Sequence, residues 1–300
     1  MNGMKVMGIV STPLFIWRHP LSKGQRMGRL LRFVKWQIGS RLVLGPVAAR
    51  FVNDARLFVQ KGMTGATGNL YVGLHEFEDM SFVLHGLRPD DLFVDVGANV
   101  GSYTVLAGAA VGASCVSFEP IPETFGWLLA NIHLNAIAHR VEARNIGLGE
   151  AEGTFRFTKH WDTTNHVVLA DEDQGTIEVP VQSLDQVLGN RRPALIKIDV
   201  EGFESPVIAG GNEVLESEGL LGVLMELNGS GRCYGFDEQR LHERMLDHRF
   251  RPFRYSPFER SLVPLDKNNQ AGNTLYLRNL DEMEERLKTA PAFWVDGHSI

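Results

Sequence analysis

The spacing of hydrophobic and polar positions changes near residue 90. From there on, short runs of consecutive apolar residues alternate with longer stretches in which apolar residues recur every three to four positions. The runs predict buried strands and the stretches predict helices. The predicted strands are Leu92–Val96, Ala113–Phe118, Leu195–Ile198 and Leu220–Met225, and the predicted helices cover residues 102–111, 122–135, 204–217 and 237–247. Continuous apolar strands separated by helices are typical of an α/β fold with a doubly wound, mostly parallel sheet and helices on both faces.

Other segments carry weaker patterns. Thr154–Thr158 and Thr176–Val181 alternate polar and apolar residues like edge strands. Thr274–Leu277 reads as a strand that pairs antiparallel beside the 250s. Residues 61–80 contain four glycines, which favour turns or a short hairpin. The polar cluster in that segment (His75, Glu76 and Glu78) either closes over a site or forms a solvated loop.

The first 60 residues predict an amphipathic helix. In residues 22–38, Arg26, Arg29, Arg32 and Lys35 follow one another at intervals of three, with apolar residues between them. On a helix this spacing places a basic ridge beside an apolar stripe. Two interpretations stay open. Such a helix lies on an anionic membrane surface, or it packs on its own domain with its arginines in solvent.

Charge is distributed unevenly along the chain. Met1–Asn53 contains nine basic residues and no Asp or Glu. Because the net charge of the whole chain is −6, the other 247 residues carry a net charge of −15. That balance argues against a nucleic-acid partner. The two cysteines exclude a disulfide-rich scaffold, and no apolar run approaches the ~20 residues of a membrane span. We expect a cytoplasmic protein, and peripheral contact at the inner membrane face through residues 22–38 is one of the two open interpretations of the amphipathic helix.

The strongest chemical motif is DLFVDVGANVGSYT, residues 91–104. A strand ends at Asp95, and Gly97 and Gly101 then shape a turn into a helix. Ligands of open parallel sheets bind at such strand ends. The next strand ends at Glu119, 22 residues after Gly97, which is the spacing of an acid that accepts hydrogen bonds from ribose hydroxyls. The motif therefore predicts a nucleoside cofactor.

The identity of that cofactor follows from its charge. Dinucleotide folds use G-x-G-x-x-G, whereas this turn is G-x-x-x-G with Asp95 beside it. A carboxylate there repels a pyrophosphate and suits a cationic ligand such as S-adenosylmethionine. A dinucleotide-dependent oxidoreductase remains the alternative enzyme, and a noncatalytic membrane adaptor that acts through its basic helix is the alternative without catalysis.

A second group of polar residues follows two later strands. Asp199 and Glu201 come after Leu195–Ile198, and Glu226 and Asn228 end the next strand. Carboxylates at neighbouring strand ends converge on one crevice. There they act as a general base or hold a divalent cation.

Residues 91–120 and 195–215 together resemble the FkbM family of S-adenosylmethionine-dependent methyltransferases. The matching pieces are DVGANVGSYT, FEP, LLANIHLN and LIKIDVEGFE. The resemblance covers about residues 80–280 and implies a class I methyltransferase fold and methyl transfer to a hydroxyl of a sugar, glycan or polyketide. It implies that the methionine part of the cofactor is held by Asp95, Gly97, Asn99 and Gly101, its ribose by Glu119, and its adenine by Asn145 and Ile146.

A hydroxyl acceptor needs a group that takes up its proton. Asp199 is the first candidate base and Glu201 the second, while Asp199, Glu226 and Asn228 alternatively form a Mg²⁺ site. The polar loop at residues 159–168 places His160 and His166 where they contact the acceptor, or where they are only solvated.

These patterns divide the chain into three parts. Residues 1–80 form a basic helical extension and a glycine-rich lead-in, residues 81–280 the cofactor-binding domain, and residues 281–300 a tail. The expected partner is a small-molecule or glycan acceptor. The oligomeric state does not follow from the sequence.

Overall fold

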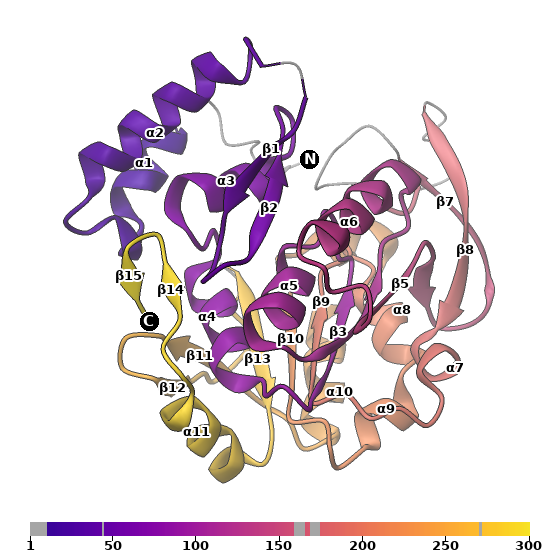
Figure 1. Cartoon of the computed structure of the whole chain (residues 1–300). Coiled ribbons are helices and arrows are strands. Elements are labelled where there is room, and N and C mark those ends of the chain that lie inside the picture. The colour runs from indigo at the N-terminus through magenta and orange to yellow at the C-terminus, as the bar shows by residue number, and fades with distance from the viewer. Residues whose placement is uncertain (1–10, 44, 159–165, 169–174, 270–271) are drawn as a thin grey trace.

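The computed structural model of the chain describes residues 11–43, 45–158, 166–168, 175–269 and 272–300, and an eight-stranded sheet lies at its centre (Figure 1). The sheet consists of β3 (Leu92–Val96), β4 (Ser114–Phe118), β5 (Val141–Arg144), β9 (Leu195–Ile198), β10 (Gly222–Glu226), β11 (Arg251–Ser256), β12 (Ser261–Pro264) and β13 (Asn273–Leu277). The strand order is β12-β11-β13-β10-β9-β3-β4-β5. The five strands from β5 to β10 are parallel. β13 runs antiparallel between β10 and β11, which confirms the strand predicted beside the 250s.

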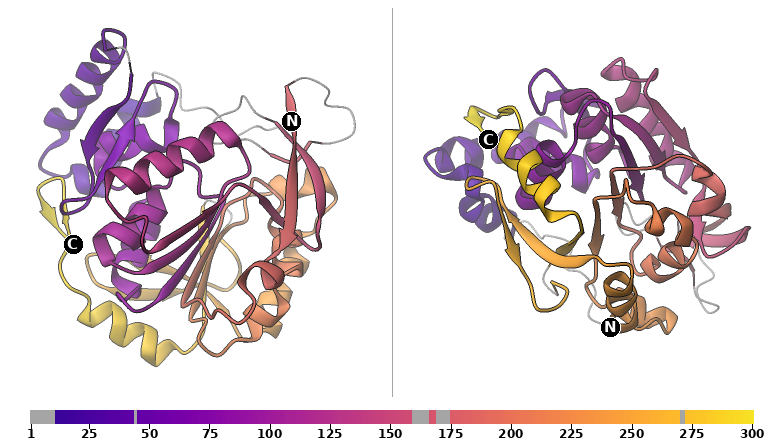
Figure 2. Two further views of the ribbon diagram at one scale, coloured as in Figure 1. Left: turned by 45° about the vertical axis from the view of Figure 1, so that its right-hand side comes forward. Right: turned by 90° about the horizontal axis from the view of Figure 1, so that it is seen from below.

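Helices cover both faces of the sheet, as the apolar strands predict (Figure 2). The residues of β9 show the division, because Leu195 packs in one hydrophobic cluster while Ile196 and Ile198 pack in the other. One face is covered by α4 (Phe77–Gly86), α5 (Ser102–Val105), η2 (Leu106–Val111) and α11 (Leu280–Thr289). The other is covered by α7 (Leu184–Leu188), α8 (Glu204–Ala209), α9 (Asn212–Glu216) and α10 (Glu238–Asp247). α6 (Pro122–Leu134) packs on β5 on the same side of the sheet as α5 and η2.

The predicted helices form with two internal changes. The helix expected at 102–111 continues from α5 into the π-helical segment η2. The helix expected at 204–217 is divided into α8 and α9. A Cβ atom at Gly210, between the two, would lie 2.2 Å from the carbonyl oxygen of Gly149. The chain therefore breaks the helix where two backbones pass in direct contact.

The two strands predicted as edge strands belong to a sheet of their own. β7 (Gly153–Thr158) pairs antiparallel with β8 (Thr176–Ser183), and β8 pairs with β6 (Gly147–Gly149). Apolar side chains from this small sheet form a separate cluster against Phe203 and Tyr234. The alternating pattern identified the strands, but it did not identify the sheet that they join.

The hairpin or turns predicted for residues 61–80 are wrong. This segment forms α3 (Thr64–Val72) and the first turn of α4. A Cβ at Gly68, inside α3, would lie 2.2 Å from His75 Nδ1, so this glycine permits close packing. Gly73 ends α3 with a φ of 88°, a conformation that glycine adopts without strain. The glycines thus pack and end a helix instead of forming a hairpin.

The N-terminal segment forms α1 (Ser11–Arg18), η1 (Pro20–Ser22), α2 (Arg26–Gly39), and the paired strands β1 (Val47–Arg50) and β2 (Arg56–Val59). The helix predicted at 22–38 is therefore present. Both Figure 1 and Figure 2 show α2 at the outer edge of the molecule, near the hairpin of β14 (Trp294–Val295) and β15 (His298–Ser299).

Two arginines of α2 point inward. Arg29 is 1% exposed, and its Nη2 lies 3.0 Å from Asp296 Oδ2. Arg32 donates to both oxygens of the same carboxylate, at 2.8 and 2.7 Å. The prediction that the arginines of this helix lie in solvent is wrong for Arg29, which is buried against a distant carboxylate, while Arg32 is 38% exposed and pairs with the same carboxylate.

The N-terminal segment shares its core with the rest of the chain. Leu21 and Val52 belong to the same hydrophobic cluster as Phe93 of β3. The boundary expected at residue 80 falls inside α4, and the expected tail contains α11 and the β14–β15 hairpin. Within the described residues, no helix has the length and hydropathy of a membrane span.

Candidate active site

The loop Gly97–Gly101 connects β3 to α5 at the carboxyl end of the sheet. Gly97 has a φ of 77°, and a Cβ there would lie 1.9 Å from the carbonyl oxygen of Asp199. No larger residue fits, because β3 and β9 are neighbours and their ends touch. The loop therefore brings the first predicted motif into direct contact with the second.

Glu119 fixes the conformation of this loop. It is 5% exposed at the end of β4, and its Oε2 accepts a hydrogen bond from the backbone N–H of Asn99 at 2.9 Å. Its Oε1 accepts one from the backbone N–H of Ile121 at 2.9 Å. Burial raises the pKa of Glu119 to about 7 against the effect of these two donors. Each carboxylate oxygen keeps a lone pair that can accept a hydrogen bond from a further donor, such as a ribose hydroxyl. The ribose contact of Glu119 therefore stays a prediction with which this geometry is compatible.

Asp95 is buried on the sheet face below the loop. Thr104 Oγ1 donates to its Oδ2 at 2.7 Å, and the hydroxyls of Thr104 and Ser117 are also 2.7 Å apart. Among the described residues, the Oδ1 atom of Asp95 has no hydrogen-bond partner. Burial raises the pKa of Asp95. A buried carboxylate oxygen without a donor suits a ligand that carries an ammonium or sulfonium charge.

An apolar pocket lies beside Gly97, at the end of β4. Ile146, Phe118, Phe157 and Phe203 are among its lining residues. Asn145 does not point freely into this space, since its Nδ2 donates to the carbonyl oxygens of Glu119 and Pro120 at 2.8 and 2.9 Å. The pocket has a volume of about 20 Å³, which is room for about one water, so the adenine contact of Ile146 stays a prediction. Asn145 shapes the strand ends around it.

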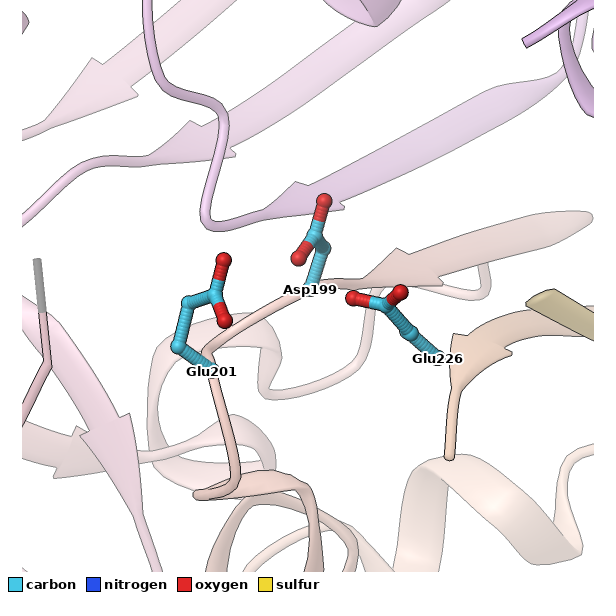
Figure 3. Close-up of side chains that lie close together, drawn as sticks. All are labelled: Asp199, Glu201 and Glu226. Carbon is cyan, nitrogen blue, oxygen red and sulfur yellow. The ribbon is translucent and has the colours of Figure 1, made fainter. Parts of the chain in front are cut away.

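Three carboxylates meet at the ends of β9 and β10. Figure 3 shows the side chains of Asp199, Glu201 and Glu226 turned toward one shared space. One oxygen from each lies within 4.8 Å of the others. Glu201 adopts a left-handed backbone conformation, with a φ of 52°, in the turn after β9. The convergence predicted from strand-end positions is therefore present.

Glu201 and Glu226 hold their protons more tightly than isolated carboxyls do. Burial, followed by the charge of Asp199, raises the pKa of Glu201 to about 8 and that of Glu226 to about 7. Like charges this close disfavour ionisation of both partners. Near neutral pH the cluster can therefore take up or release a proton, as a general base requires.

Lys197 is the site residue that the sequence prediction missed. It is 3% exposed in β9, and its Nζ donates to Asp199 Oδ2 at 2.9 Å. In the sheet register Lys197 is paired with Asp95 of β3. Burial alone would lower the pKa of Lys197, but Asp199 and Asp95 raise it, so the lysine stays charged. The signal for it was a lone lysine in an apolar strand, two residues before Asp199 and hence on the same face.

The lead-in helices also reach the site. Tyr103 Oη donates to Glu76 Oε2 at 2.5 Å, and the ring of Tyr103 lies 4.7 Å from Lys197 Nζ. Glu76 is near enough to raise the pKa values of Glu226 and Lys197. Asp79 accepts from Asn273 at 2.9 Å, and burial raises its pKa to about 7. The polar cluster of His75, Glu76 and Glu78 was expected either to close over a site or to form a solvated loop. Glu76 lies at the site, as the first interpretation expects.

The other predicted site residues have different positions. Asn228, expected to bind a cation with Asp199 and Glu226, is exposed, and its Oδ1 accepts from Ser230 N at 2.9 Å. Its side chain thus stabilises the turn after β10 and also hydrogen-bonds Glu226, so it lies beside the cluster, in which Glu201 is the third carboxylate. His166 is half-buried, with its backbone N–H donating to Thr158 Oγ1 at 3.0 Å. His160 lies outside the described residues.

The residues present fit S-adenosylmethionine. Asp95 offers an unpaired buried oxygen for a cationic group, Glu119 offers acceptors for ribose hydroxyls, and the apolar pocket offers a surface for a base. The glycine loop leaves the strand ends free of side chains where a ligand approaches. The three-carboxylate cluster begins at Asp199, which touches Gly97 of this loop.

Comparison with known proteins agrees with this geometry. Residues 95–252 match the family model of the methyltransferase FkbM domain. The chain is 32% identical over 173 residues to the 31-O-demethyl-FK506 methyltransferase FkbM of Streptomyces tacrolimicus (45% of this chain, 65% of that protein). It is 27% identical over 147 residues to the hexuronic acid methyltransferase AglP of Haloferax volcanii (47% of this chain, 59% of that protein).

Among solved structures, the chain is similar to the precorrin-6y C5,15-methyltransferase of Geobacter metallireducens, with 13% identity, coverage of 68% of this chain and 89% of that chain, and a TM-score of 0.39. The matches span about three fifths of the length of the curated relatives. The family model itself covers the glycine loop, the acid at the end of β4 and the whole carboxylate cluster. The chain therefore belongs to the FkbM family of S-adenosylmethionine-dependent methyltransferases.

Proposed function

We propose that this protein transfers a methyl group from S-adenosylmethionine to a hydroxyl oxygen of a sugar, a glycan, or a glycosylated or polyketide metabolite. The observation that carries the proposal is the cluster of Asp199, Glu201 and Glu226 directly beside the cofactor loop. The names of two relatives, one acting on an FK506 precursor and one on a hexuronic acid, support an oxygen-rich acceptor.

The chain contributes binding and orientation first. Asp95 and Glu119 hold the cofactor by its charge and its ribose, and the loop from Gly97 sets its distance from the sheet. The cofactor, when bound, supplies a methyl group on a cationic sulfur that is ready to leave as a neutral thioether. The protein then aligns the acceptor oxygen with that bond.

The carboxylate cluster removes the proton of the acceptor. As the acceptor oxygen takes the methyl group and the sulfur leaves as a thioether, the hydroxyl proton would pass to Asp199, whose side chain is 30% exposed. The ammonium of Lys197 orients this carboxylate by its 2.9 Å hydrogen bond. Glu201 and Glu226 share the negative charge and relay the proton to solvent.

The same three carboxylates have the hard oxygen atoms that Mg²⁺ prefers. A bound cation would hold the acceptor hydroxyl and lower its pKa. Chelation distinguishes the two roles: turnover that persists in EDTA, with no metal copurifying, assigns the cluster to proton transfer alone.

The test is methyl transfer from isotopically labelled cofactor to a panel of acceptors: hexoses, uronic acids, glycosides and hydroxylated polyketides. We expect labelled methyl ethers, identified by the ¹³C chemical shift of an O-methyl carbon. Labelled N-methyl or C-methyl products would overturn the O-methyl assignment. Tight binding of NAD without binding of S-adenosylmethionine would overturn the assignment of the cofactor.

A further inference from the structure

Helix α2 presents apolar side chains to solvent. Met27, Leu31, Val34 and Ile38 are all exposed, with Met27 at 71% and Ile38 at 58%. At 3.6 residues per turn these four positions form one stripe along the helix. The buried residues of α2, Arg29 and Phe33, are on the opposite side. A helix that packs on its own domain normally buries its apolar residues; α2 packs Leu30, Phe33 and Trp36 inward and still leaves a second apolar stripe in solvent.

The exposed apolar surface extends beyond α2. Among the described residues, nine of the thirteen exposed large apolar side chains fall between Leu14 and Val47. They include Trp17 on α1 and Leu42 just after α2, and Leu42 is 77% exposed. Monomeric proteins rarely leave such a concentration of apolar surface without a partner. We call this set of residues the N-terminal apolar face.

The charges of the segment that forms this face are all positive. The exposed basic residues of the same segment are Arg18, Lys23, Arg26, Lys35, Arg41 and Arg50. The segment contains no Asp or Glu before Asp54. Apolar side chains flanked by cations, without acids, complement a surface that combines anionic headgroups with an acyl interior. A protein partner would need an acidic, apolar patch of matching shape, which nothing in this face specifies.

The arginines that face inward maintain this orientation. Because Asp296 binds both Arg29 and Arg32, α2 cannot rotate its apolar stripe toward the core without breaking these ion pairs. α2 in turn packs on α3, and Asn69 of α3 donates to Ser102 at the start of α5 at 3.3 Å. The face is thus joined rigidly to the end of the molecule that carries the cofactor loop.

We propose that the N-terminal apolar face docks the protein on an anionic lipid bilayer, with α2 parallel to the surface. Met27, Leu31, Val34 and Ile38 enter the headgroup–acyl boundary, and the flanking lysines and arginines contact the anionic headgroups. Neither contribution gives stable binding alone, so binding requires both the apolar stripe and the negative surface charge.

The test is cosedimentation of the full chain with vesicles of phosphatidylglycerol and phosphatidylcholine, compared with vesicles of phosphatidylcholine alone. We expect binding to the anionic vesicles, little binding to the zwitterionic ones, and release at high salt. Leu31→Gln with Ile38→Gln should lower the partition coefficient about tenfold or more, because two anchoring side chains are lost at constant charge. Lys35→Gln with Arg41→Gln should lower it several-fold on anionic vesicles only.

Val263→Gln is the matched control, since Val263 is an exposed apolar residue of β12 outside the N-terminal segment. All variants should retain the wild-type melting temperature and affinity for S-adenosylmethionine, because the substituted side chains are exposed. Failure of the wild type to bind anionic vesicles overturns the proposal, as does equal binding by the Leu31/Ile38 variant. A concentration-dependent dimer that this variant abolishes, without vesicle binding, would instead assign the face to a second copy of the chain.

Discussion

Two buried cations lie in different parts of this protein and are neutralised in different ways. Lys197 in β9 has Asp199 two positions along its own strand and Asp95 opposite it in the next strand. Arg29 in α2 has Asp296, which is 267 residues away in the C-terminal hairpin. The first pair follows from the two-residue period of a strand. The second exists only because the two ends of the chain pack together.

The two ion pairs also differ in what they do for the protein. The carboxylate that neutralises Lys197 is half-buried and belongs to the site, so the ion pair orients a reacting group. The carboxylate that neutralises Arg29 joins two segments and has no place in the chemistry. Four substitutions or conditions test this division, from the largest expected effect to the smallest.

Replacing Asp199 with Asn should lower kcat about a thousandfold, because the amide cannot accept the proton of the hydroxyl. The affinity for S-adenosylmethionine, measured by calorimetry, should change by no more than about threefold, since Asn still accepts the hydrogen bond of Lys197. Glu218→Gln, an exposed acid, serves as the control. A kcat within tenfold of wild type would mean that Asp199 only supports the fold.

Replacing Asp296 with Asn should lower the free energy of unfolding by about 3 kcal/mol, because Arg29 then lies buried without a counter-charge. The value is read from urea denaturation. The kcat of the folded fraction should stay near that of wild type. Asp266→Asn, at an exposed acid that forms no ion pair with the described residues, should change the stability by less than about 0.5 kcal/mol. Equal losses of unfolding free energy in the two variants would show that Asp296 does not stabilise the buried charge of Arg29.

Replacing Glu119 with Ala should weaken the binding of S-adenosylmethionine about tenfold to a hundredfold. The variant loses the acceptors for ribose hydroxyls and leaves the N–H groups of Asn99 and Ile121 without their carboxylate. Glu119→Gln separates these effects, since it keeps one acceptor oxygen and most of the shape. Unchanged affinity in both variants would limit Glu119 to a structural role.

Raising the pH from 6.5 to 8.5 should lower the stability of the wild type by about 2 kcal/mol relative to Glu201→Gln. The folded protein raises the pKa of Glu201 from 4.5 to about 8. It therefore binds a proton that the unfolded chain releases, and the stabilisation present below pH 4.5 is lost as the pH rises toward 8. Urea curves at several pH values measure the difference. Parallel curves for the two proteins would show that Glu201 ionises as it does in the unfolded chain.

The strands and the first site residues were predictable because local patterns determine them. Leu92–Val96 and Leu195–Ile198 have the bounds that their apolar runs predict. Parallel strands end at one edge, so Asp95, Glu119 and Asp199 had to lie near one another. The prediction for residues 61–80 failed because glycine count was taken as a sign of turns, whereas Gly68 is small so that His75 can pack against α3.

The sequence by itself determined the α/β fold, the cofactor class and the acids at the strand ends, since each depends on periods of two or 3.6 residues and on positions next to a strand. The tertiary structure decided which acids lie together: Glu201 joins Asp199 and Glu226, and Glu76, the residue before α4, contacts Tyr103 beside them. It also decided which face of α2 points outward, because Asp296 holds Arg29 and Arg32 from the far end of the chain. Contacts between residues far apart in sequence follow from packing, and no local pattern contains them.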